Sequence, residues 1–157
     1  MPKRFGKALQ RVLRRRLKRL ERDGDQAIRS GDEDALHAVR IDVKRLRYSL
    51  EFAVPIAGKE ARDALSLLAH AQERFGALAD AVMFGRTYAE LLDAEPANST
   101  RRAGLQRLHD DAMRAQTDAL ISVRALWNGA AGEEPYPDKL RASISETLGS
   151  LSKSDDS

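Results

Sequence analysis

The apolar residues of this chain recur every three to four positions, and this spacing is the feature that most limits its fold. Such spacing places them on one side of a helix. No segment shows the alternation of apolar and polar residues that is typical of a half-buried strand. The sequence therefore predicts an all-α protein. The first two apolar faces consist of Phe5, Leu9, Val12, Leu13, Leu17 and Leu20, and of Leu36, Val39, Val43, Leu46 and Leu50.

Turn and capping residues indicate where the helices end. Gly31 breaks the chain, and Asp32 or Asp34 is expected to cap the helix that follows. Ser99 or Thr100 is expected to cap the last long helix in the same way. The expected helices cover residues 3–22, about 32–54, 59–93 and about 99–127.

Short connections between four long helices predict an antiparallel four-helix bundle, which we assign to residues 1–130. Residues 131–157 are expected to lie outside it, as a linker, a short helix over residues 138–149 and a disordered tail.

Composition excludes several classes of protein. The chain contains no cysteine, which excludes disulfides, thiolate catalysis and cysteine-based metal sites. No apolar run approaches the roughly 18 residues that cross a bilayer, and no apolar signal segment follows the first residues. We therefore expect a cytoplasmic protein. The aromatic share of 5% predicts a core built mostly from Leu, Ala and Val.

Four cationic or cationisable residues form a line on the second helix, with the spacing H-x-x-R-x-x-x-K-x-x-R. At 100° and 1.5 Å per residue, they fall within an arc of roughly 80° and a length of about 15 Å. They border the apolar face of that helix rather than opposing it. This geometry favours a basic groove or pore wall for an extended polyanion over an ordinary solvated face. We call these residues the basic stripe: His37, Arg40, Lys44 and Arg47.

The positive charge of the chain is concentrated at its N-terminus. Residues 1–22 carry ten Lys or Arg against one Glu, for a net charge of +9. Residues 48–157 carry twelve against seventeen, for a net charge of −5. The first helix therefore adds cations that could assist the basic stripe.

Two motifs resemble the CHAD family, the conserved histidine α-helical domain. The segment His37–Tyr48 is similar to its signature, a His followed by an Arg and a Lys- and Arg-rich cluster ending in Leu-Arg. The segment Gln72–Val82 is similar to a second family motif, from which it differs by having Phe75 for Leu and Ala79 for Asn. The resemblance covers about residues 5–127.

This resemblance implies binding of inorganic polyphosphate in a basic channel between two similar four-helix halves. The chain is long enough for one half only, so we expect a homodimer, or a different chain that supplies the second half. The ligand residues that the resemblance implies are His37, Arg40, Lys44, Arg45 and Arg47. Arg11, Arg14, Arg15 and Lys18 are added on the basis of their charge alone.

Binding without catalysis is the expected activity. The sequence shows no Gly-rich phosphate loop, no metal-binding carboxylate cluster and no Ser-His-Asp order. It also lacks the E-x-E-x-K pattern of the triphosphatase-like domain that often accompanies the family. We expect no cofactor and no metal, since the neighbours of His37 on the stripe are cations and His70 and His109 read as surface histidines.

Three other activities remain open at this stage. The basic helix could bind nucleic acid, although Tyr48 is the only aromatic residue beside the stripe. The amphipathic first helix could bind an anionic membrane or granule surface. A polyphosphate-processing enzyme is the third.

Three polar or small residues of the second motif share one helical face, namely Gln72, Gly76 and Asp80. We expect Gly76 to allow close helix packing. Gln72 and Asp80 are expected to satisfy buried polar groups or to orient a basic side chain, rather than to bind a ligand.

Overall fold

The computed structural model describes residues 3–155, and all the elements within them are helices. The prediction of an all-α fold is therefore confirmed for this part of the chain. None of the described helices is long and apolar enough to cross a membrane. The helices are α1 (Lys3–Ser30), α2 (Glu33–Glu51), α3 (Val54–Ala57), α4 (Lys59–Ala94), α5 (Arg102–Asn128) and α6 (Tyr136–Asp155).

Helix α1 is eight residues longer than the sequence analysis predicted. Ala27 and Ile28 are buried and continue the apolar face beyond residue 22. The helix ends where Gly31 adopts a φ of 66°, a conformation that favours glycine. Asp32 then caps α2, as expected, by accepting the N–H of Ala35 at 2.9 Å.

The predicted cap of the fourth long helix is wrong. Helix α5 begins at Arg102, and its cap position, Arg101, has no side-chain hydrogen bond. Ser99 instead accepts the N–H of Arg101 at 3.1 Å, within the turn that precedes the helix. The sequence signal was therefore a turn and not a helix start.

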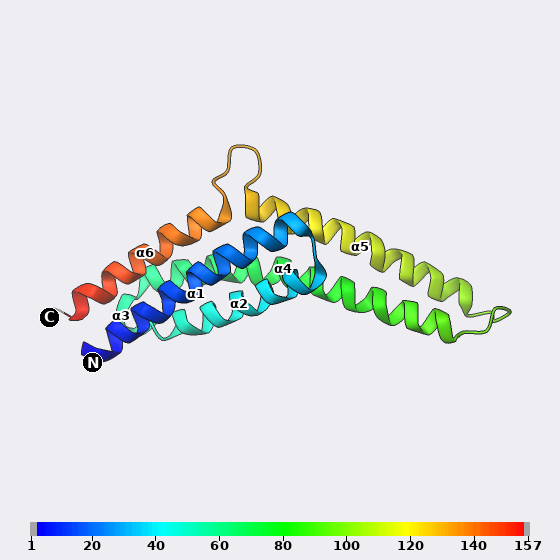
Figure 1. Cartoon of the computed structure of the whole chain (residues 1–157), viewed down its shortest axis with the longest axis horizontal. Helices are drawn as coiled ribbons and strands as arrows, with labels where there is room; N and C mark the ends of the chain where they lie inside the picture. The colour runs from blue at the N-terminus through cyan, green and yellow to red at the C-terminus, as the bar shows by residue number, and fades with distance from the viewer. Residues whose placement is uncertain (1–2, 156–157) are drawn as a thin grey trace.

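Four helices enclose the core, but they are not the four that the sequence predicted. Helix α2 packs between α1 and α4, and α6 closes the bundle by packing against both α1 and α4. Figure 1 shows α6 beside α1, with both chain ends at the same end of the bundle. Residues 136–155, expected to lie outside the bundle, thus take the place that we assigned to 99–127.

Helix α6 takes this place because its own sequence is amphipathic. Its buried side chains recur every three to four residues and belong to the same core as those of α1, α2 and α4. The helix continues to Asp155, so the tail expected at residues 152–157 is helical over 152–155, and residues 156–157 lie outside the described residues. The buried apolar positions of α6 are Tyr136, Leu140, Ile144, Leu148 and Leu151.

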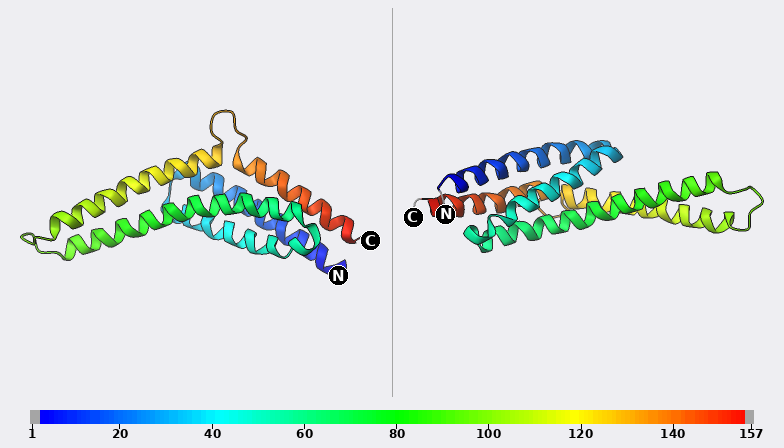
Figure 2. Two further views of the ribbon diagram at one scale, coloured as in Figure 1. Left: turned by 180° about the vertical axis from the view of Figure 1, so that it is seen from behind. Right: turned by 90° about the horizontal axis from the view of Figure 1, so that it is seen from below.

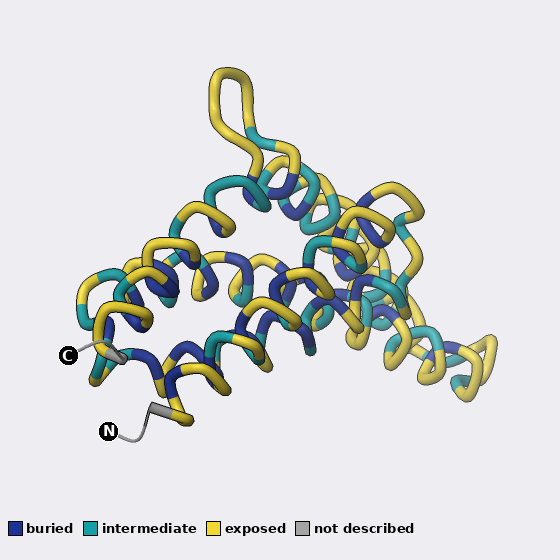
Figure 3. The backbone as a smooth tube through the Cα atoms, turned by 60° about the vertical axis from the view of Figure 1, so that its left-hand side comes forward, coloured by how far each residue is buried: buried dark blue, intermediate teal, exposed yellow. Residues whose placement is uncertain are grey.

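Helices α4 and α5 form an arm that extends beyond the rest of the molecule. Their outer halves run antiparallel to each other, away from the chain ends (Figures 1 and 2). Residues along this arm are exposed to a greater extent than those of the bundle, as Figure 3 shows. Only the inner half of α4 and the end of α5 contact the bundle core.

An aromatic cluster joins the arm to the bundle. The ring of Trp127 contacts those of Phe75 and Tyr136, with centroids 6.4 and 5.8 Å apart. Its indole N–H donates to Asp25 at 2.9 Å, and the Tyr136 hydroxyl donates to the carbonyl of Leu67 at 2.9 Å. The bundle otherwise uses mostly Leu, Ala and Val, as the composition predicted.

Replacing Gly24 with alanine is expected to destabilise the fold. A Cβ atom there would lie 2.1 Å from two ring atoms of Trp127, which is buried and held by Asp25. We expect a loss of about 1–3 kcal/mol in the free energy of unfolding, measured by urea denaturation. Gly76→Ala is the control, because a Cβ there has no neighbour within 4 Å and alanine favours a helix by about 1 kcal/mol. Equal stability of both variants would contradict the packing described here.

Candidate functional site

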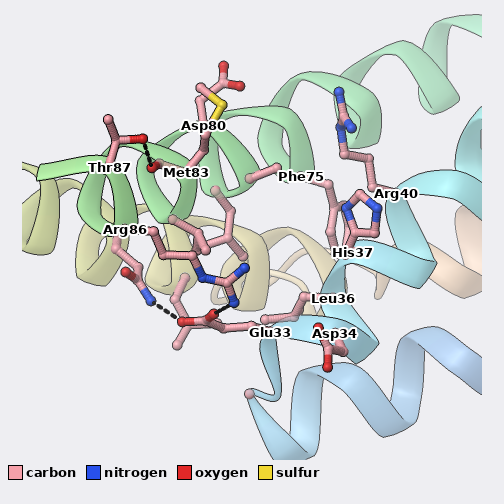
Figure 4. A pocket seen from close by; sticks show the side chains of 16 residues that line it. Glu33, Asp34, Leu36, His37, Arg40, Phe75, Asp80, Met83, Arg86 and Thr87 are labelled. Carbon is pink, nitrogen blue, oxygen red and sulfur yellow. Dashed lines mark hydrogen bonds and ion pairs between the residues drawn. The ribbon is translucent and has the colours of Figure 1, made fainter. Parts of the chain in front are cut away.

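The basic stripe lies along the edge of α2 that faces α4. The apolar residues of α2 are buried, and the side chains of the stripe project from the helix beside them, as the sequence predicted. His37 and Arg40 line a hollow of about 510 Å³ between α2, α4 and α5. Apolar side chains that include Phe75 and Leu78 form part of its wall. Figure 4 shows the two basic side chains beside each other at one end of this hollow.

Three residues of the stripe have no partner among the described residues. His37 is exposed, whereas Arg40 and Lys44 are half-buried. The Nε atom of Arg40 is buried and makes no hydrogen bond. A buried donor without a partner raises the free energy of the folded protein. A ligand that offers an acceptor to this atom would therefore gain binding free energy.

Arg47 differs from the other stripe residues because the fold already holds it. It donates to the Gln72 side-chain carbonyl at 2.8 Å and lies 3.5 Å from a carboxylate oxygen of Glu51. The expectation that Gln72 orients a basic side chain is confirmed. The expectation of close packing at Gly76 is wrong, since Gly76 lines an open hollow between α2 and α4.

A polar network closes the other end of the hollow that His37 and Arg40 line. Glu33, in the first turn of α2, accepts from Arg86 of α4 and, at 3.1 Å, from Gln116 of α5 (Figure 4). This network ties the arm to α2 next to His37. The sequence analysis missed it, because no local spacing relates residues 53 and 83 positions apart.

The structure does not bring all the predicted ligand residues to one surface. Arg45 projects from α2 toward α1, where it lines a separate hollow with Arg15. Arg11, Arg14 and Lys18 are exposed on the side of α1 opposite its buried leucines. The stripe beside α4 therefore contains His37, Arg40, Lys44 and Arg47 only.

A pair of carboxyl groups lies on the α1 side of α2. Asp42 is 5% exposed, and burial together with a hydrogen bond to Asp23 and its charge raises the pKa of Asp42 to about 6. Burial acts to raise the pKa of Asp23 as well, but hydrogen bonds to Asp42 and Arg22 outweigh it, and the pKa is lowered. The opposite directions of the two shifts mean that Asp42 takes up a proton more readily than Asp23.

Among residues 3–155, no group of three or more His, Cys, Asp or Glu side chains is placed to hold a metal ion. His70 is exposed, and His109 lies 3.8 Å from a carboxylate oxygen of its neighbour Asp110.

Comparison with known proteins gives one positive result. The family model described as CHAD domain matches residues 2–89, which is more than half of the chain. The match includes α1, α2 and most of α4, and thus both motifs, but it ends before the 127 that the sequence resemblance suggested. No curated protein and no solved structure matches the chain.

Replacing Asp42 with asparagine is expected to stabilise the protein at neutral pH. Because the pKa of Asp42 is raised from 3.8 to about 6, the fold favours its protonated form, and stability falls as the pH rises from about 4 to about 6. The amide of the variant can still donate a hydrogen bond to Asp23, and because it does not ionise, the variant does not lose stability over this pH range. We expect it to exceed the wild type by about 1–3 kcal/mol at pH 7 and to match it near pH 4.

Urea denaturation at both pH values measures this difference. Asp118→Asn, at an exposed position on α5, is the control for removal of one negative charge. A variant less stable than the wild type at pH 7 would mean that the arginines near Asp42 stabilise its ionised form.

Proposed function

The chain belongs to the CHAD domain family, and we propose that it binds inorganic polyphosphate through the basic stripe without processing it. The observation that carries this proposal is the line of three cationic or cationisable side chains without a partner among the described residues, His37, Arg40 and Lys44. A polyanion would offset the repulsion among them and give the Arg40 Nε an acceptor.

The shape of the stripe favours a linear ligand. Its four residues extend for about 15 Å along α2. Polyphosphate presents repeated anionic groups along a chain and no base edges, so contacts from Arg and Lys are sufficient to bind it.

The side chains of the stripe favour binding over turnover. All four of its positions carry a basic nitrogen, and none carries a carboxylate or a hydroxyl. Arg and Lys stabilise the charge of bound phosphate without activating water, and His37 is the one residue of the stripe whose type can also act as a general base.

A second copy of the chain is proposed to complete the site. The stripe is open on its outer side, where Tyr48 of α2 and Phe52, directly after the end of this helix, are 53% and 63% exposed. Large aromatic side chains at such exposure are typical of interaction surfaces. Pairing about a two-fold axis through this face of α2 would place two stripes opposite each other, as the walls of one channel.

Nucleic-acid binding is the second candidate function. The observation that favours it is the same exposed Tyr48, which lies one residue beyond Arg47 and could stack on an unpaired base. Attachment to an anionic membrane or granule surface through α1 is a further alternative, since the cations of this helix are exposed.

Charge reversal of Arg40 and Lys44 to Glu is expected to weaken polyphosphate binding by about 100-fold or more while leaving the helical circular dichroism unchanged. Titration with long-chain polyphosphate at two salt concentrations measures this, with duplex and single-stranded DNA of equal charge as competitors. The matched control reverses Arg62 and Arg107, two exposed arginines outside the stripe.

Selective binding of polyphosphate by the wild type, lost in the stripe variant only, supports the proposal. An equal loss of affinity in the matched control would mean that binding depends on the net charge of the protein and not on the stripe. Preferential binding of single-stranded DNA would favour the nucleic-acid function, and binding only to vesicles with anionic lipid would favour the surface adaptor.

Replacing Tyr48 and Phe52 with Ser is expected to weaken dimer formation by about tenfold or more, because buried aromatic side chains often contribute more than about 1 kcal/mol each to an interface. Light scattering over a concentration series, with and without polyphosphate, measures the mass. Ile121→Ser is the control, since Ile121 is 62% exposed on α5, away from the stripe. A wild-type monomer under all conditions would exclude the homodimer.

A further inference from the structure

The seam between α1 and α2 contains a second cluster of cations, on a different side of α2 from the basic stripe. At 100° per residue, Arg45 lies about 80–160° around the helix from the stripe residues. It faces α1 and lines a hollow of about 230 Å³. The residues that line this hollow are Arg15, Arg16, Arg19, Asp42 and Arg45.

Two of these arginines are fixed by the fold. Arg16 reaches across the seam and donates to the carbonyl of Arg45 at 2.6 Å and to the Ser49 hydroxyl. The Arg19 Nε lies 3.5 Å from a carboxyl oxygen of Asp42 and 3.6 Å from one of Asp23. Half of the cluster is therefore held in place before any ligand arrives, which lowers the entropic cost of binding.

The other two arginines are available. Arg15 and Arg45 are exposed, and neither side chain forms a hydrogen bond or ion pair within residues 3–155. Long side chains in this state can close over a ligand and offer it two N–H groups each.

The charges of the hollow do not balance. Four guanidinium groups line it together with a single carboxyl group, that of Asp42. This carboxyl group is hydrogen-bonded to that of Asp23. One carboxyl oxygen of Asp42, Oδ2, is buried and has no partner in the described structure. When ionised, Asp42 repels an oxyanion in the hollow, so its carboxylate opposes the four guanidinium groups.

We propose that the α1–α2 seam is a second oxyanion site, which binds a small phosphate anion such as pyrophosphate independently of the polyphosphate stripe. This site goes beyond the proposed function. It gives Arg15 and Arg45, which the sequence analysis assigned to the polyphosphate site, a ligand of their own.

Calorimetric titration of the full chain with pyrophosphate at constant salt tests the site. The seam variant replaces Arg15 and Arg45 with Gln, and the stripe variant replaces Arg40 and Lys44 with Gln. The charge-matched control replaces Arg62 and Arg107 with Gln. We expect the seam variant alone to lose about tenfold or more in pyrophosphate affinity.

Asp42→Asn gives an independent test in the opposite direction. It removes the only carboxyl group of the hollow while keeping a hydrogen-bond donor, so pyrophosphate is expected to bind several-fold more tightly at pH 7 than to the wild type. Weaker or unchanged binding would contradict the placement of the anion beside Asp42.

Three results would overturn the proposal, and each is distinct from failure of the polyphosphate site. The wild type could fail to bind pyrophosphate at millimolar concentration, while still binding the long chain. The stripe variant, and not the seam variant, could lose the small anion, which would place it on the stripe. The seam variant and the matched control could lose equal affinity, which would leave only net charge as the cause.

Discussion

The packing of α2 between α1 and α4 determines where the cations of this protein can lie. The apolar arc of α2 is buried against both neighbours, so its polar side chains emerge at two seams or on the outer face. His37, Arg40 and Arg47 emerge beside α4, and Arg45 emerges beside α1. A change in the apolar arc would therefore shift both cation clusters relative to α1 and α4, so the proposed binding depends on the packing of this core.

Local periodicity was sufficient to predict the existence of the long helices and the basic stripe, but not all of the helix bounds. The apolar positions of α2 and the stripe beside them need only the 3.6-residue repeat. The role of α6 was not predicted, although Leu140, Ile144 and Leu148 carry a helical spacing, because the Gly- and Glu-rich stretch before them resembles a linker. The choice between α5 and α6 as the fourth helix of the bundle depends on long-range packing, which no single segment encodes.

The cations of the candidate site were identified from the sequence, but the surface on which each of them lies was not. Arg15 was grouped with the stripe by its charge and Arg45 by the resemblance to the family motif, and neither argument tells which seam a side chain enters. The Glu33 contacts to Arg86 and Gln116 depend on the arm returning to the start of α2, and the Asp23–Asp42 pair depends on the register of α1 against α2. Each of these features depends on how two or three helices pack together, whereas the stripe lies on a single helix.

The position of α6 has a consequence for synthesis on the ribosome. Helices α1, α2 and α4 emerge first, yet α1 and α4 each pack one side against α6, the last of the described helices. Until residues 136–151 have emerged, those apolar sides have no covering helix, and a nascent chain with exposed apolar surface is prone to aggregation or to capture by chaperones. The bundle is therefore expected to close late, in a step whose rate depends on contact between distant parts of the chain.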